Sequence, residues 1–232
     1  MNKIAIISDI HGNLPALDAV LKDIKNQGIN TVYCLGDLVG YYCFFNEAVE
    51  RLEREEIPCI MGNHDYALVK NNGIINRSKT CTTILKWQLE RATEKTLNFL
   101  ANLKETLEIT HQGKTILCTH GGLNDSIDEY LFDLNEAYLL ENDFQHDILL
   151  TGHTHLISYK KFFNGKAWVN PGSVGQPRDF DNRASYAIID ENSGISFRRV
   201  SYDYKLVVAK MKELGFDDYI SETLINGVKI GR

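Results

Sequence analysis

The first third of the chain alternates short apolar runs with amphipathic segments, and this order limits the folds open to it. The runs KIAIIS, TVYCLG and PCIMGN are typical of strands. Between them, NLPALDAVLKDIKNQG spaces its apolar side chains three or four residues apart, as an amphipathic helix does, and NEAVERLEREE predicts a second helix. Asn13 is the expected N-cap of the first helix and Gly28 its expected end. The alternation predicts parallel β-α-β units.

The other two thirds of the chain predict helices and antiparallel hairpins. Residues 78–103 are expected to form an insertion that is helical throughout, and the tail from about residue 203 is expected to be helical. Hairpins are predicted to turn at Gln112-Gly113, Asn164-Gly165 and Ser193-Gly194. We therefore predict a single α/β domain over residues 1–232, with two sheets or one mixed sheet.

Composition narrows the class of protein. The 232 residues are 44% hydrophobic and 24% charged, which suits one large globular domain. A net charge of −6 argues against a nucleic-acid-binding surface, and a phosphate ligand would need a local cation. No signal-peptide pattern and no apolar run near the ~18 residues of a membrane span occur, so we expect a cytoplasmic protein. The five cysteines form no C-x-x-C pair, and Cys34, Cys59 and Cys118, which lie in strand-like runs, are interpreted as reduced core thiols.

Polar side chains that bind metals follow one predicted strand after another. In chain order they are Asp9 and His11, Asp37, Asn63 and His64, His120, and His153 and His155. In open α/β sheets, ligands gather at the carboxyl ends of strands. Five of the seven histidines therefore fall where a site would form, and only His111 and His146 fall elsewhere.

Each of these residues has a structural explanation when it is taken alone. Asp37 suits a turn after Gly36, and Asn63 with His64 suits an Asx-type turn. Together, however, they all follow apolar strands beside glycines and all offer nitrogen or oxygen donors, which favours a shared metal site. Two aspartates, four histidines and an asparagine, with no thiolate, suit Mn, Fe, Zn or Ni.

The number of donors favours two divalent ions over one. Seven donors exceed the need of one tetrahedral ion, whereas two ions that share a carboxylate would use them all. Such a pair lowers the pKa of a bridging water and holds the oxygens of an in-line displacement at phosphorus. His64 would then lie beside the metals, where it can donate a proton to a phosphoryl or leaving oxygen.

The motifs D-x-H, G-D, G-N-H-D, H-G and G-H-x-H, in this order, resemble the calcineurin-like metallophosphoesterase superfamily. NPGSVGQPRD followed by ASYAIID resembles its small bacterial and archaeal phosphodiesterase branch, so the resemblance covers roughly residues 3–190. It implies a four-layer α/β/β/α sandwich of two mixed sheets and a catalytic histidine at His64. The implied metal ligands are Asp9, His11 and His155 for the first ion, Asp37 as the bridge, and Asn63, His120 and His153 for the second.

The chain departs from its relatives after the second motif. The serine/threonine phosphatase branch continues with an aspartate and a phosphate-gripping arginine, and GDLVGYY has neither, which argues against a protein phosphatase. Tyr41, Tyr42, Phe44 and Phe45 are candidates for a base-stacking pocket, or else core or oligomer contacts. NPGSVGQPR is expected to be a loop that shapes the site. Two arginines that follow, Arg178 and Arg183, are candidates for contacts with substrate phosphate, or else surface residues.

The sequence thus predicts a dinuclear metal-dependent phosphoesterase that hydrolyses small phosphodiesters or nucleotides through a metal-bridging hydroxide. A dinucleoside-polyphosphate hydrolase or a phosphomonoesterase is the alternative enzyme. A catalytically weak protein-binding scaffold is the alternative of another class, although such relatives typically lose ligands and this chain keeps all eight positions. The expected partner is a small phosphate ester or nucleotide, with no membrane and no nucleic acid. The sequence does not distinguish a monomer from a homo-oligomer.

Overall fold

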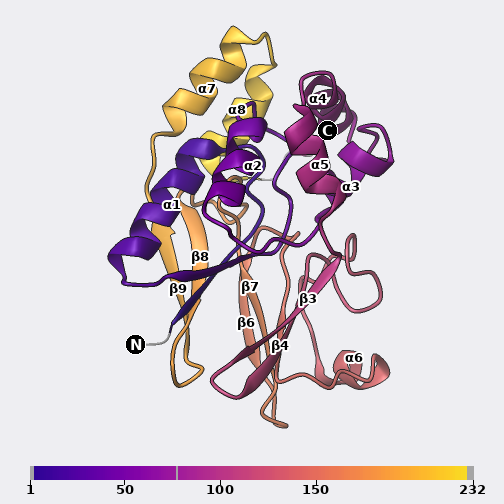
Figure 1. Cartoon of the computed structure of the whole chain (residues 1–232), viewed down its shortest axis with the longest axis vertical. Helices are drawn as coiled ribbons and strands as arrows, with labels where there is room; N and C mark the ends of the chain where they lie inside the picture. Colours follow the sequence, from indigo (N-terminus) through magenta and orange to yellow (C-terminus); the bar gives the residue numbers. More distant parts are fainter. Residues whose placement is uncertain (1–2, 77, 229–232) are drawn as a thin grey trace.

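Two mixed sheets form the centre of the molecule in a computed structural model that describes residues 3–76 and 78–228 (Figure 1). The first sheet has the strand order β2-β1-β8-β9, from β1 (Ile4–Ile7), β2 (Thr31–Cys34), β8 (Ala184–Ile189) and β9 (Ile195–Val200). The second has the order β3-β4-β5-β7-β6, from β3 (Thr106–His111), β4 (Lys114–Thr119), β5 (Ile148–Leu150), β6 (Ile157–Lys161) and β7 (Ala167–Pro171).

Strand pairing follows the sequence prediction. β1 pairs in parallel with β2 across the helix α1 (Leu14–Asn26), and β4, β5 and β7 are parallel to one another in the second sheet. The three predicted hairpins join β3 to β4, β6 to β7 and β8 to β9 as antiparallel pairs. At two of the turns, Gln112 and Ser193 adopt positive φ, followed at Gln112 by Gly113 with φ +76°. The first parallel β-α-β unit and the three antiparallel hairpins are confirmed, whereas the parallel pairing of β4, β5 and β7 was not predicted.

The alternation of side chains along β1 explains the layers. Ile4 and Ile6 point into the core between the two sheets, where they join Ile116 of β4 and Val169 of β7. Neighbouring residues such as Ile7 point the other way, into a core under α1 and α2 (Phe45–Arg54). On the far side of the second sheet, residues of α6 (Glu136–Glu141) pack against another apolar cluster. This is the predicted four-layer α/β/β/α sandwich.

The remaining helices cover the end of the sandwich where the site forms. They are α3 (Asn63–Lys70), α4 (Lys79–Leu89), α5 (Glu94–Ala101), α7 (Tyr204–Glu213) and α8 (Asp218–Asn226). In Figure 1, α3, α4 and α5 gather on one side and the C-terminal α7 and α8 on the other. A cluster from α4, α7 and α8 packs on Tyr41, Tyr42 and Cys43, which brings the predicted helical tail against the loop after β2.

Two local predictions were wrong. The predicted third strand makes only isolated bridges at Cys59 and Ile60, because the chain turns at once into α3, which begins at Asn63. Residues 78–103 form two helices rather than a continuous one. The side chain of Thr93 accepts a hydrogen bond from the Thr96 N–H at 3.1 Å and so caps a new helix after α4 has ended.

No helix within residues 3–76 and 78–228 is both long enough and apolar enough to span a membrane. The five cysteines are free, as expected, and four of them are buried.

Candidate metal centre

The loops at the carboxyl ends of the strands bring the predicted ligands together. Asp9 and His11 follow β1, and Asp37 follows β2. Asn63 and His64 open α3, His120 follows β4, and both His153 and His155 lie between β5 and β6. All eight side chains are buried. Residues that lie up to 146 positions apart in the chain thus converge at one edge of the two sheets, as the strand order predicts.

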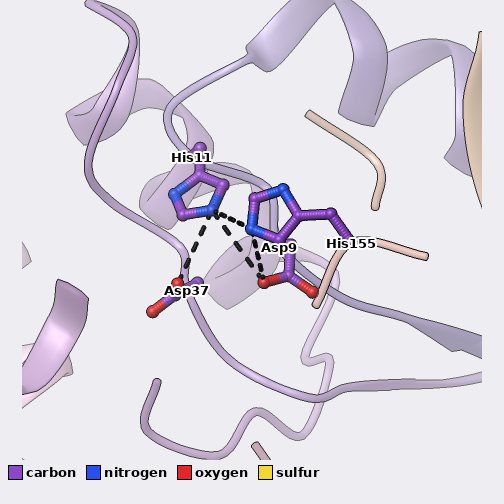
Figure 2. A group of neighbouring side chains, drawn as sticks. All are labelled: Asp9, His11, Asp37 and His155. Atoms are coloured by element: carbon purple, nitrogen blue, oxygen red, sulfur yellow. Dashed lines mark hydrogen bonds and ion pairs between the residues drawn. The ribbon is translucent and has the colours of Figure 1, made fainter. Parts of the chain in front are cut away.

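Two groups of donor atoms share one carboxylate. Asp9, His11, Asp37 and His155 form the first group, drawn in Figure 2, and Asp37, His120 and His153 form the second. Within each group the donor atoms lie within 4.8 Å of one another. Asn63 joins the second group, since its Oδ1 lies 3.3 Å from His120 Nε2. The shared position of Asp37 is the geometry that a bridging ligand requires.

Two histidines of the first group point bare nitrogens at each other. His11 Nδ1 lies 2.9 Å from the Val39 carbonyl oxygen, and His155 Nδ1 lies 2.5 Å from that of Gln176. A carbonyl only accepts, so each Nδ1 carries the proton and each Nε2 presents a lone pair. The two Nε2 atoms are 3.1 Å apart. Burial lowers the pKa of both rings well below 6.5, which keeps them neutral.

Buried carboxylate oxygens face these lone pairs. His155 Nε2 lies 3.2 Å from Asp9 Oδ1, and His11 Nε2 lies 3.5 Å from Asp37 Oδ2. Asp9 Oδ1 and Asp37 Oδ2 make no hydrogen bond to any residue in the described part of the chain. A buried oxygen without a partner is costly. Lone pairs and anionic oxygens that converge on one point fit a cation held between them.

The second group has the same construction. His120 Nδ1 lies 2.7 Å from the Leu35 carbonyl oxygen, and its Nε2 lies 3.4 Å from Asp37 Oδ2. Burial would lower the pKa of His120, but the nearby carboxylate of Asp37 outweighs it and raises that pKa to about 10. Burial would likewise raise the pKa of Asp37, and His120 and His64 hold it well below 3.8. The site therefore attracts positive charge.

Five of these residues also have a strained backbone. Asp9, His11, Asp37, His153 and His155 all have positive φ, between 53° and 67°. This left-handed region costs an L-residue about 1–2 kcal/mol. Strained non-glycine residues gather at functional sites when the surrounding structure holds them there. Gly62 shows how tight the packing is, since a Cβ at that position would lie 2.2 Å from Asp37 Oδ1.

His64 lies beside the two groups. Its backbone N–H donates to Asp37 Oδ1 at 2.8 Å, which ties the first turn of α3 to the shared carboxylate. The centroid of its ring is 4.8 Å from that of His11, and burial lowers its pKa. Its Nδ1 is buried and makes no hydrogen bond to the residues that the structure describes. The ring is thus held next to the donors without being part of either group.

Arg178 and Tyr41 lie at the edge of the site. Arg178 donates to the Tyr41 hydroxyl at 3.0 Å and to Gln176 Oε1 at 2.9 Å. The centroid of the Tyr41 ring lies 4.6 Å from that of His11 and 4.9 Å from that of His64. The two side chains therefore place a cation and a phenol next to the histidines.

The structure does not bring the other two candidates to the site surface. Arg183 is exposed and forms a bidentate pair with Asp181, with Nη2 to Oδ2 at 2.6 Å. Tyr42 is 1% exposed and lies in an apolar cluster, where its hydroxyl is 3.4 Å from Thr223 Oγ1. Phe45 is also 1% exposed and belongs to the core. Arg183 is thus a surface residue, and Tyr42 and Phe45 are core residues, which were the alternative interpretations of the sequence.

The loop NPGSVGQPR shapes the site, as predicted. Ser173 Oγ donates to the Asp9 carbonyl oxygen at 2.8 Å, and the Gly175 N–H donates to the same oxygen at 2.9 Å. Gln176 supplies the carbonyl that orients His155.

The sequence interpretation overlooked Asp65, whose carboxylate accepts hydrogen bonds from the N–H groups of Leu38 and Gly62. Its place directly after Asn63 and His64 was the available signal.

A sequence model of the calcineurin-like phosphoesterase superfamily domain matches residues 2–194. The chain belongs to this superfamily. Among curated relatives, the chain is 36% identical to the uncharacterised protein MJ0912 of Methanocaldococcus jannaschii, over 97% of this chain and 98% of that one. It is 26% identical to the phosphodiesterase YfcE of Escherichia coli, over 83% of this chain and 89% of that one.

Solved structures share the fold of this chain. The crystal structure of a metallophosphoesterase from Sphaerobacter thermophilus superposes with a TM-score of 0.83 at 30% identity, covering 98% of this chain and 99% of that one. A hypothetical protein, PH1004 from Pyrococcus horikoshii, superposes with a TM-score of 0.86 at 22% identity, covering 99% of this chain and all of the other. Superfamily membership and the two donor groups together indicate a phosphoesterase with a site suited to divalent metal ions.

Proposed function

We propose that the protein is a dinuclear metal-dependent phosphodiesterase that hydrolyses small phosphodiesters or nucleotides. One observation carries the proposal: the facing Nε2 atoms of His11 and His155 meet carboxylate oxygens that make no hydrogen bond within the described residues. A metal cation between them relieves both the lone-pair repulsion and the buried negative charge. Because Asp37 belongs to both groups, a second ion could bind beside the first and share its carboxylate.

The donor set supports the following assignment. Asp9, His11 and His155 would hold one ion, Asn63, His120 and His153 the other, with Asp37 shared between them. Imidazole and carboxylate donors without a thiolate suit Mn, Fe, Zn or Ni. The carbonyl oxygens of Val39, Leu35 and Gln176 accept from the Nδ1 atoms of His11, His120 and His155 and so direct the three Nε2 atoms toward the ions.

Two bound ions would supply a nucleophile from water at neutral pH and stabilise charge on the phosphoryl oxygens. The chain itself supplies orientation and a proton. Arg178, held by Gln176 and Tyr41, would orient a phosphoryl oxygen by a charge-assisted hydrogen bond. His64, buried between Gly40 and His11, would donate a proton to the leaving oxygen.

Similarity to the Escherichia coli phosphodiesterase favours diester over monoester hydrolysis. A dinucleoside-polyphosphate hydrolase and a phosphomonoesterase remain the alternative enzymes. The scaffold alternative is disfavoured because all eight predicted positions are present and buried in the cluster. A small substrate, rather than nucleic acid, fits the net charge of −6.

The test is metal-dependent turnover. Protein stripped with a chelator is assayed with bis-p-nitrophenyl phosphate and p-nitrophenyl phosphate after Mn, Ni, Zn, Fe or Mg is added back. Turnover that requires metal and favours the diester supports the proposal. Preference for the monoester would instead support the phosphatase alternative. Two bound ions without turnover of either ester would contradict the diesterase and favour the scaffold.

A His64→Ala variant tests the role of the histidine separately. We expect it to bind the same amount of metal and to lose most turnover, by roughly 10²- to 10⁴-fold, the range for a general acid. His146→Ala is the matched control, because His146 lies outside the site next to Glu108. Full activity of His64→Ala would remove this side chain from the mechanism.

A further inference from the structure

A pair of stacked aromatic rings, the half-buried Tyr130 and the exposed Phe132, leads outward from the metal centre. Tyr130 and Phe132 lie in the loop between β4 and α6, with parallel planes (1°) and centroids 5.5 Å apart. Tyr130 in turn stacks on His153, with centroids 3.8 Å apart and planes at 29°. Phe132 is 60% exposed. Three rings thus form a continuous row that runs from a predicted metal ligand to the surface.

The loop that carries this row is anchored on both sides of Phe132. Leu131 and Leu134 are buried in the cluster over the outer face of the second sheet. The Glu129 carboxylate accepts from the Tyr138 hydroxyl at 2.7 Å and from the Asn124 N–H at 3.0 Å. Because these contacts fix the loop, Phe132 is held in solvent instead of folding onto the core. A rigid exposed aromatic side chain beside a site is typical of a recognition surface.

Tyr130 also connects the row to the expected phosphate position. Arg178 donates to the Tyr41 hydroxyl at 3.0 Å and also forms a side-chain hydrogen bond with Tyr130. Its permanently charged guanidinium therefore contacts both tyrosines. A phosphate that contacts Arg178 and the metal centre would have its remaining substituent next to Tyr130 and Phe132. The Tyr130 ring is centred 3.8 Å from the His153 ring, and the Phe132 ring is centred a further 5.5 Å from Tyr130.

We propose that Phe132, supported by Tyr130, is a stacking platform for a nucleobase, so that the substrate is a nucleoside phosphate ester rather than an aliphatic one. A nucleoside 5′-phosphate carries its base at a distance from phosphorus comparable to these two steps. Bases of every kind stack on aromatic rings, and the platform selects for a base without selecting its identity. The proposal rests on the proposed function for the position of the phosphate. It replaces Tyr42 and Phe45, which lie in the core, as the stacking residues.

Titration calorimetry of the manganese-loaded protein with adenosine 5′-monophosphate and with ribose 5-phosphate tests the platform. The two ligands share the phosphate and the sugar and differ in the base. Released phosphate is measured in the same samples, and where hydrolysis occurs the ratio of KM values is used. We expect the nucleotide to bind at least about tenfold more tightly than the sugar phosphate, the size of one stacking contact.

Three variants separate stacking from general damage. Phe132→Ala should reduce the nucleotide preference to about twofold or less and leave ribose 5-phosphate unchanged, whereas Phe132→Trp should restore the preference. Phe163→Ala is the matched control, because Phe163 is fully exposed at the far end of the hairpin that starts after His155.

Equal binding of both ligands to the wild type, or an unchanged preference in Phe132→Ala, would refute the platform even if diesters are hydrolysed. A preference that depends on Phe132, without turnover of bis-p-nitrophenyl phosphate, would support the platform and contradict the proposed reaction. The two proposals therefore fail separately.

Discussion

Replacing Gly40 by alanine should disable catalysis while leaving the metal ligands in place. Gly40 has φ +92° and packs directly against the catalytic candidate, so that a Cβ there would lie 2.3 Å from His64 Nδ1. Ordinary van der Waals contact begins at 3.4 Å. The imidazole must therefore withdraw by about 1 Å, a displacement that can reduce turnover about 10²-fold.

The backbone contributes a separate and smaller effect. An alanine with positive φ costs about 1–2 kcal/mol of stability. For a protein of this size, 1 kcal/mol corresponds to a change in Tm of about 2–4 °C. Gly28 offers a matched control, since it has φ +71° at the end of α1 and a Cβ there would meet nothing within 4 Å. Gly28→Ala should lose similar stability and keep full activity.

The assay compares both variants with wild type in turnover of bis-p-nitrophenyl phosphate, in metal content and in Tm. Metal content matters because the new Cβ would also lie 3.2 Å from His11 Nδ1. We expect Gly40→Ala to keep its metal and to lose about 10²-fold in kcat relative to Gly28→Ala. If the kcat of Gly40→Ala stays within threefold of the control, the position of His64 does not limit the reaction, and the reasoning is refuted.

Three further outcomes follow from the site and its surroundings. Asp37→Asn should weaken the binding of both metals by more than the roughly 10- to 100-fold seen when a residue that only hydrogen-bonds to a ligand is changed, because Asp37 belongs to both donor groups. Two ions that are still tightly bound on metal analysis would contradict a shared Asp37. Chelation should lower Tm by about 5–10 °C, as expected if metal at 100 times its Kd contributes about 2.7 kcal/mol, and an unchanged melting curve would argue against a buried metal site.

The third outcome of this group concerns pH. Hydrogen bonds from Lys114 and Thr115 lower the pKa of Asp147 from 3.8 to about 2, so its ionised form stabilises the fold at neutral pH and this contribution is lost as pH falls from about 4 towards 2. Asp147→Asn should therefore lower the free energy of unfolding at pH 7 by less than about 1 kcal/mol. The difference from wild type should narrow at pH 3, and a difference that is the same at both pH values would contradict the lowered pKa.

Local periodicity was sufficient for most of the fold. The spacing of Leu14, Leu17, Val20 and Ile24 predicted α1, and the turn pairs predicted all three hairpins. Periodicity was insufficient where tertiary contacts or caps decide the outcome. Nothing in the apolar pattern of residues 78–103 marks the break at Thr93, which depends on a side-chain cap, and the short run after Pro58 ends in a helix because α3 must begin at Asn63.

The sequence by itself determined which residues meet at the site, because metal-binding side chains follow strand ends and parallel strands end at the same edge. The tertiary structure decided how those residues are oriented and what surrounds them. Gln88 of α4, for example, accepts from the Gly40 N–H and donates to the Tyr42 carbonyl oxygen, both at 2.8 Å, and so holds the loop that packs on His64. The stacking of Tyr130 on His153 is decided in the same way. Such contacts join irregular loops whose paths depend on packing between distant elements, and no periodic pattern in the chain encodes them.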